Sequence, residues 1–124
     1  MDDEGKEYPL ARLGLGMGRL LAIAFGLHFA KGQRLLLDEV ETGLHYETQE
    51  KVWAWIFESS KKLDVQVFAA THSLDCVRAF SKVADESGEV GILYRLDRKF
   101  GPIRVVAYDE RKLRIASEQD IEVR

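Results

Sequence analysis

The sequence predicts an α/β fold in which two parallel strands flank a helix and an antiparallel hairpin follows. Short apolar runs at residues 34–38 and 65–71 have the length of strands, and residues 46–63 between them show helical spacing. Two more apolar runs, at 90–96 and 103–108, are joined by a segment that contains Gly-Pro. With 124 residues, the chain favours one domain with a modest core.

Composition and charge indicate a soluble protein of a reducing compartment. Hydrophobic residues make up 46% of the chain and charged residues 31%, and the net charge of −3 provides no basic field for nucleic acid. The single cysteine, Cys76, excludes an internal disulfide. The acidic N-terminus lacks a signal-peptide pattern, and the apolar-rich run at 20–30 is too short to span a bilayer. We therefore expect a cytoplasmic protein without membrane contact.

A glycine-rich segment precedes the first predicted helix. Residues 13–19 predict a turn that contains Gly14, Gly16 and Gly18, and helical spacing follows over residues 20–29. A glycine-rich loop at a helix N-terminus can bind an anion through free backbone N–H groups. A tight turn into a packing helix is the alternative, and the spacing alone favours it.

Two adjacent acids, Asp38 and Glu39, close the first predicted strand. An apolar run this short indicates a buried parallel strand, and ligands sit at the carboxyl ends of such strands. One carboxylate there can hold Mg²⁺ while the next polarises water. An apolar run closed by two acids also arises by chance. The other motifs must therefore decide whether Asp38 and Glu39 form a functional site.

The next helix and strand complete a right-handed βαβ unit. We expect the ion pairs Glu47–Lys51 and Glu58–Lys62 on the solvent side of the helix over 46–63. The inner face of this helix is predicted to consist of Val52, Trp53, Ile56, Phe57, Ser60 and Leu63.

The second strand ends in Thr71-His72-Ser73. Because the two strands are predicted to be parallel, His72 should lie at the same sheet edge as Asp38 and Glu39. There it is well placed to sense a phosphate, although a lone histidine at a strand end is more often a surface residue. Ser73 or Thr71 can cap a helix over 74–84, in which Cys76 is a small buried filler.

The last third is predicted to add an antiparallel hairpin to the sheet and then a short helix over residues 110–117. It is locally basic, with acids interleaved, which is typical of a solvated face. No nucleic-acid motif accompanies it.

Together these stretches resemble the C-terminal half of an ABC-type ATPase domain, among the AAA/ABC-like proteins related to the overcoming-lysogenization-defect ATPases. Residues 10–21 resemble the signature loop and its helix, and 35–39 resemble Walker B. Residues 41–45 resemble the D-loop, and 70–73 the histidine switch. The resemblance spans nearly all of residues 1–124 and implies the C-terminal lobe of a P-loop NTPase-like fold.

The resemblance implies ATP and Mg²⁺ as cofactors and assigns a role to three residues. Asp38 would hold Mg²⁺, directly or through water. Glu39 would be the general base that orients the attacking water. His72 would contact the γ-phosphate and report its presence.

The resemblance also implies that the chain acts in a dimer. The signature loop, with Gly14, Gly16 and Gly18, would bind the partner's nucleotide across a head-to-tail interface, and the D-loop would line that interface. Homo- and heterodimers both fit. A nucleic-acid partner is left open for the wider assembly and is not indicated for this chain.

Two motifs depart from the family pattern. No G-x-x-x-x-G-K-[ST] sequence is present, so the phosphate loop would have to come from a missing N-terminal ATPase half or a second ATPase subunit. The serine that usually precedes the signature glycines is also absent, because Arg12-Leu13 stands before Gly14. We do not expect ATP hydrolysis by the chain alone.

Two other functions stay open. The chain can be a non-catalytic module that docks on an ATPase partner or on itself. It can also be a metal-dependent nuclease of the Toprim kind that uses Asp38, Glu39 and Glu41, although Thr71-His72-Ser73 stands where that class has a second acidic pair.

Overall fold

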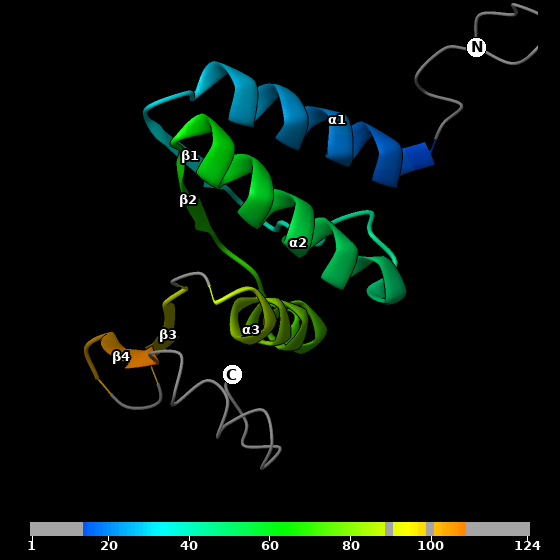
Figure 1. Cartoon of the computed structure of the whole chain (residues 1–124). Coiled ribbons are helices and arrows are strands. Elements are labelled where there is room, and N and C mark those ends of the chain that lie inside the picture. Colours follow the sequence, from blue (N-terminus) through cyan, green and yellow to red (C-terminus); the bar gives the residue numbers. More distant parts are fainter. Residues whose placement is uncertain (1–13, 89–90, 99–100, 109–124) are drawn as a thin grey trace, which may run out of the picture.

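A computed structural model describes residues 14–88, 91–98 and 101–108 of the chain, and its elements follow the predicted order (Figure 1). A helix comes first, then a strand–helix–strand unit, a third helix and a hairpin. The elements are α1 (Gly14–Phe29), β1 (Arg34–Leu37), α2 (Tyr46–Leu63), β2 (Gln66–Ala69), α3 (Leu74–Ser87), β3 (Leu93–Asp97) and β4 (Arg104–Tyr108).

Strands β1 and β2 pair in parallel, as predicted, but they are not buried on both faces. Leu36 and Phe68 are register partners on one face, and 77% and 50% of their surfaces are exposed. Leu35, Leu37 and Val67 point to the other face and pack against the core. The prediction of a buried strand is therefore wrong, because the helices that the structure describes cover one face of this two-stranded sheet and leave the other exposed.

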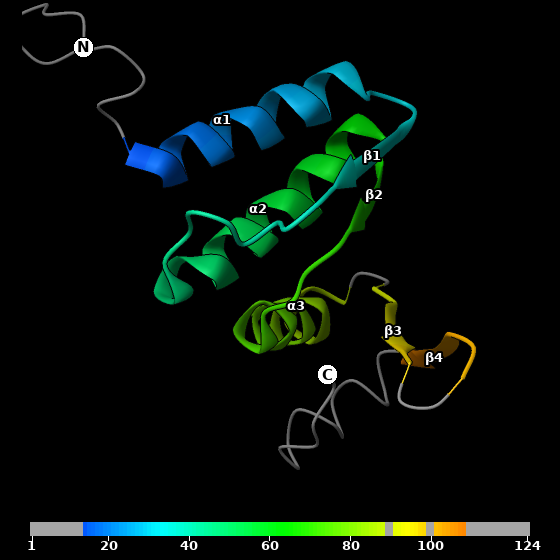
Figure 2. The same cartoon turned by 180° about the vertical axis from the view of Figure 1, so that it is seen from behind.

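The core lies between the three helices and the covered face of the sheet. Helices α1 and α2 lie side by side in both views of the molecule (Figures 1 and 2). Trp53 of α2 packs edge-on against Phe80 of α3, with ring centroids 5.0 Å apart, and Phe57 stacks on the same ring. The buried apolar residues are Ile23, Leu27, Val40, Val52, Trp53, Ile56, Val65, Cys76, Ala79, Val83 and Ala84.

Helix α1 begins at Gly14 with a left-handed φ of 79°, so the predicted glycine-rich turn over 13–19 is helical from Gly14 onward. Glycine disfavours helix interiors by about 1 kcal/mol per residue relative to alanine, which is why the sequence indicated a turn. Packing overrides that preference here, because the backbone of Gly43 lies directly against Leu15 and Gly16.

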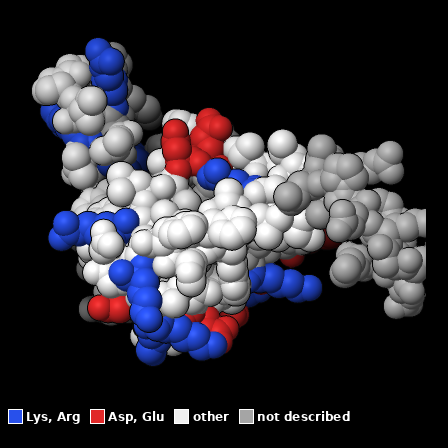
Figure 3. Space-filling model, turned by 90° about the horizontal axis from the view of Figure 1, so that it is seen from above, with Lys and Arg blue, Asp and Glu red and all other residues white. Residues whose placement is uncertain are grey.

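The outer surface of α1 is apolar and uncovered among the described residues. Leu15, Met17, Phe25 and Phe29 are exposed there, and the space-filling view from the α1 side shows a broad uncharged area (Figure 3). A helix that is hydrophobic all round is typical of a covered helix. Over the ranges that the structure describes, no helix combines the length and hydropathy needed to cross a membrane.

We call the exposed sheet face that carries Leu36 and Phe68 the bare face of the sheet, and we expect it to drive self-association at high concentration. Leu36→Lys should shift the chain toward the monomer in sedimentation velocity, because it places a charge in the middle of that face. Ala54→Lys is the matched control, since Ala54 is exposed on α2. A strict monomer at high concentration would contradict this expectation.

The helix ends follow the predicted signals, with small shifts in length. Asp64 ends α2 in the left-handed conformation, and Ser73 caps α3 by accepting a hydrogen bond from the Cys76 N–H at 3.3 Å. Helix α3 continues to Ser87, three residues beyond the predicted end. The pair Glu58–Lys62 is present at 2.6 Å, whereas the Glu47 carboxylate lies 3.6 Å from His45 Nδ1.

Strands β3 and β4 form the predicted antiparallel hairpin, but the hairpin is a separate sheet rather than an extension of β1–β2. The path of the chain after α3 explains this difference. Gly91 packs closely on Phe80 and Ala84, so the backbone passes over α3 before the hairpin begins. The predicted helix over 110–117 lies outside the described residues.

Candidate functional site

The acids that close β1 stand in a tight turn, residues 38–45, which we call the acid turn. Val40 anchors it: its side chain is 2% exposed, and its N–H donates to the carbonyl oxygen of Ala70 at 3.2 Å. Asp38 and Glu39 precede this anchor and are exposed. Glu39 has a left-handed φ of 44°, which non-glycine residues rarely adopt. The turn therefore presents two carboxylates to solvent from a fixed backbone.

His72 follows β2 at the same edge of the sheet, as predicted. The Ala70 N–H donates to the carbonyl oxygen of Leu37 at 2.8 Å, which keeps the two chain segments together beyond the paired strands. The His72 N–H then donates to Glu41 Oε1 at 3.3 Å. The imidazole itself is exposed. The structure thus brings the acid turn and the histidine together, with Glu41 as the side chain that joins them.

Arg19 of α1 is a member of this site that the sequence did not indicate. Its Nη2 donates to the carbonyl oxygen of Asp38 and, at 3.1 Å, to that of Glu39. One guanidinium therefore connects the glycine-rich helix to both acids through their backbone. The only signal in the sequence was a basic residue directly after the glycine run.

The three glycines of α1 have different surroundings. A Cβ on Gly16 would lie 2.6 Å from the carbonyl oxygen of Gly43, so Gly16 permits the helix to touch the acid turn. Gly14 begins the helix with positive φ. A Cβ on Gly18 would meet no atom of the described residues within 4 Å. Packing thus accounts for Gly16, while Gly18 stays open to an approaching group.

Glu41 is more enclosed than the two acids before it. Its Oε2 is buried and has no hydrogen-bond partner in the described part of the chain. Nearby, burial raises the pKa of the Cys76 thiol, and hydrogen bonds with Trp53 and Thr71 oppose this rise while the charge of Glu41 adds to it. Cys76 is 1% exposed and is the buried filler that the sequence predicted.

The acids suit a metal that brings its own ligands. Among the described residues, no group of three or more His, Cys, Asp or Glu side chains could hold a metal ion. Mg²⁺ needs no such cage, because it keeps several waters and binds one or two carboxylates together with substrate phosphates. An exposed carboxylate at a strand end, as in Asp38, fits that mode of binding.

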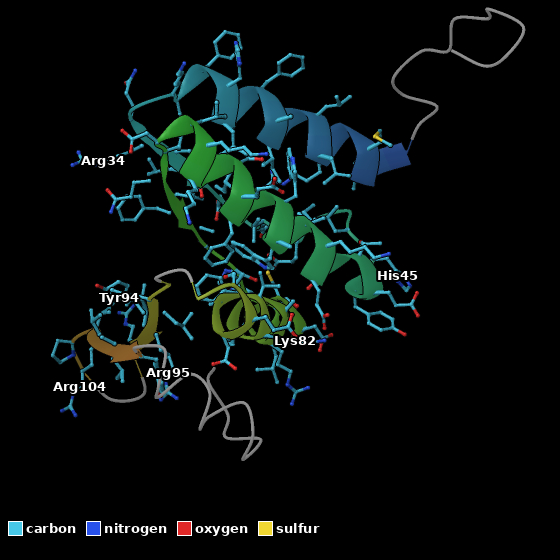
Figure 4. All side chains as sticks on the ribbon, in the orientation of Figure 1. Arg34, His45, Lys82, Tyr94, Arg95 and Arg104 are labelled. Atoms are coloured by element: carbon cyan, nitrogen blue, oxygen red, sulfur yellow. The ribbon has the colours of Figure 1, made fainter. Side chains whose placement is uncertain are left out.

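A hollow of about 580 Å³ lies elsewhere, lined by Gly32, Gln33, Arg34, Asp64 and Gln66. Figure 4 shows Arg34 and His45 at opposite ends of α2, so this hollow lies at the other end of α2 from His45, where β1 and β2 begin. It is shallow and polar and belongs to the start of the strands, so it is not the site of the predicted chemistry.

Comparisons with known proteins bear on the family and the fold of the chain. Residues 2–76 match the family model described as "AAA domain, putative AbiEii toxin, Type IV TA system". No curated protein matches the chain. A solved structure from work on the ATP-driven dimerisation and DNA-stimulated activation of SMC ATPases matches with a TM-score of 0.61 and 20% identity. That match covers 94% of this chain and 67% of the SMC chain.

The structural match shows that the fold is α/β and P-loop NTPase-like, as the sequence predicted. The family match covers more than half of the chain, including the glycine-rich helix, the acid turn and His72. The chain is therefore a member of the AAA domain family, and it is an AAA/ABC-like ATPase domain.

Proposed function

We propose that this chain is part of an ATP-binding and ATP-hydrolysing ABC/AAA-like ATPase. It would supply the sheet edge at which ATP is hydrolysed. The observation that carries the proposal is the meeting of the acid turn and His72 at one sheet edge, held by the Glu41–His72 and Val40–Ala70 hydrogen bonds. Membership of the AAA family supports ATP as the nucleotide.

Each residue at this edge has a separate task in the proposal. Asp38 would hold Mg²⁺, which supplies positive charge to the phosphates when it is bound. Glu39 accepts the proton of the attacking water and orients that water toward the γ-phosphate. His72 donates a hydrogen bond to a γ-phosphate oxygen and so distinguishes ATP from ADP. Gly18, at which an added Cβ would meet no atom of the described residues, is in this proposal the point at which a partner's nucleotide approaches the helix.

The partner in this proposal is an N-terminal ATPase half or a second ATPase subunit that carries the phosphate loop. The bare sheet face at Leu36 and Phe68 and the outer face of α1 are the surfaces it would cover. The ATP-driven dimerisation of the SMC ATPases supports a dimeric assembly, either homo- or heterodimeric. We propose no nucleic-acid contact for this chain itself.

The chain alone is expected to bind ATP·Mg²⁺ weakly or not at all. A phosphate loop normally supplies most of the contacts to the phosphates, and this sequence has none. Isothermal titration calorimetry of the isolated chain with ATP·Mg²⁺ tests this. The comparison is the same titration after addition of the partner that carries the phosphate loop, which we call the phosphate-loop half. A dissociation constant in the low micromolar range for the chain alone would contradict the expectation.

A non-catalytic docking module is the second candidate function. The bare apolar faces and the absence of the signature serine favour it. It differs from the first candidate in one measurable respect: mixing the chain with a phosphate-loop half yields a complex without ATP turnover. The geometry does not support the metal-dependent nuclease. Glu41 accepts a hydrogen bond from the His72 N–H, so this carboxylate is turned toward His72 rather than toward Asp38 and Glu39.

A further inference from the structure

Arg19 makes a long-range contact that serves the acid turn rather than its own helix. It is half-buried on α1, and its guanidinium reaches the carbonyl oxygens of Asp38 and Glu39. These two residues are also the acids of the proposed site. Hydrogen bonds from a charged donor are stronger than those from a neutral one, so this is a firm link between two segments.

Glu39 needs such a link because of its backbone conformation. At a φ of 44°, the Cβ of a non-glycine residue comes close to the following carbonyl group. Residues in this region persist only when their surroundings hold them there. Thr42 provides part of the hold, since its N–H donates to the Glu39 carbonyl oxygen at 2.9 Å and its hydroxyl to Glu39 Oε2 at 3.3 Å. Arg19 donates to the same carbonyl oxygen from the other element.

The chemistry of Arg19 argues against a purely space-filling role. Its Nε is buried and has no hydrogen-bond partner among the residues that the structure describes. Leaving a buried donor unpaired destabilises a protein, and an apolar side chain of similar length would avoid that penalty. The two backbone contacts of Nη2 are the interactions that a guanidinium adds at this position.

We propose that Arg19 is a positioning residue, which holds the backbone of Glu39 in the left-handed conformation and thereby aims its carboxylate. Because Arg19 belongs to α1, the same contact ties the direction of Glu39 to the position of the glycine-rich helix. The catalytic meaning of this role rests on the proposed function, whereas the backbone restraint does not.

Amide hydrogen exchange of the chain measures the restraint without any nucleotide. In Arg19→Met, the Thr42 amide should exchange about tenfold faster than in the parental chain, because the Glu39 carbonyl that accepts its hydrogen bond is no longer held. Amides in the middle of α2 should keep their protection. Arg34→Met is the matched control, since Arg34 bonds the Gln66 side chain at the far end of the sheet. Equal Thr42 exchange in the two variants would overturn the proposal.

A second pair of variants separates positioning from folding. Glu39→Gly removes the Cβ that makes positive φ unfavourable, so Arg19→Met in the Glu39→Gly background should change Thr42 exchange much less than it does in the parental chain. Arg19→Lys keeps a charged donor and should give an intermediate result, which serves if Arg19→Met fails to fold. An undiminished effect in the Glu39→Gly background would show a general structural role and overturn the proposal.

Turnover in the assembled ATPase gives the functional readout. With a phosphate-loop half present, Arg19→Met should lower kcat by about tenfold or more and leave KM nearly unchanged, because the base is misdirected while binding is intact. If the parental assembly does not hydrolyse ATP, the proposed function fails and the exchange result still decides on Arg19. If it does hydrolyse ATP and Arg19→Met keeps the parental kcat, the positioning role fails alone.

Discussion

Replacing Glu39 with Gln is expected to abolish ATP turnover in the assembled ATPase and to leave nucleotide binding largely intact. Glutamine keeps the size and hydrogen-bonding reach of glutamate, but it cannot accept the proton of the attacking water. Loss of a positioned base typically costs on the order of 10²–10⁴ in rate. Glu39 is exposed at the end of β1, so the Glu39→Gln substitution should not disturb the core.

Two neighbouring variants should fail in different ways, and this separation is the stronger test. Asp38→Asn should weaken Mg²⁺-dependent nucleotide binding itself, because a metal ligand loses its charge. His72→Ala should slow turnover and reduce discrimination between ATP and ADP more than it reduces affinity. Steady-state hydrolysis and equilibrium binding measured on all three variants distinguish the three roles.

The test of Glu39 has a matched control and an outcome that would contradict it. Glu58→Gln makes the same change at an exposed acid on α2 and should leave turnover at the parental level. If Glu39→Gln also hydrolyses ATP near the parental rate, Glu39 is not the base. The docking function then becomes the better explanation of the chain.

Alanine at two glycines of α1 should have opposite effects on stability. Gly16→Ala places a Cβ 2.6 Å from the carbonyl oxygen of Gly43, so either α1 or the acid turn must move, which we expect to destabilise the fold by about 1–3 kcal/mol. Gly18→Ala places its Cβ where no atom of the described residues lies within 4 Å, and it should stabilise the helix by up to about 1 kcal/mol.

The midpoints of urea unfolding compare the two variants directly, since the same group is added two positions apart on one helix. Equal gains in stability would show that the contact between Gly16 and Gly43 does not persist in solution. In the assembled ATPase, a loss of turnover in the stabilised Gly18→Ala variant would mark Gly18 as the place where a partner's nucleotide approaches.

The parallel βαβ unit could be predicted because its signals are local and agree with one another. Asp38 closes one strand, Asp64 ends the helix and Ser73 begins the next helix, so the order of elements follows from short stretches. The meeting of the acids with His72 then follows from strand direction alone. This geometric step required no knowledge of any side-chain contact.

The features that could not be predicted depend on contacts between distant segments. The glycine-rich segment is helical, and its close contact at Leu15 and Gly16 is with Gly43 of the acid turn, which lies far along the chain. The exposure of Leu36 depends on which sheet face the helices cover, and an apolar run is the same in either case. The contacts of Arg19 and the positive φ of Glu39 likewise leave no pattern in the sequence.

The parallel pairing of β1 with β2 also bears on how the chain folds. The ladder joins residue 34 to residue 66, so the whole of α2 lies within the loop that the two strands close. Helices α2 and α3 join through the ring of Phe80, which lies 27 residues after Trp53 and 23 residues after Phe57. Loop-closure entropy delays contacts between distant residues. The two kinds of contact close loops of similar length, so we expect the helical pair and the strand ladder to form together, and the strand ends that carry the acids and His72 to become ordered in the same step.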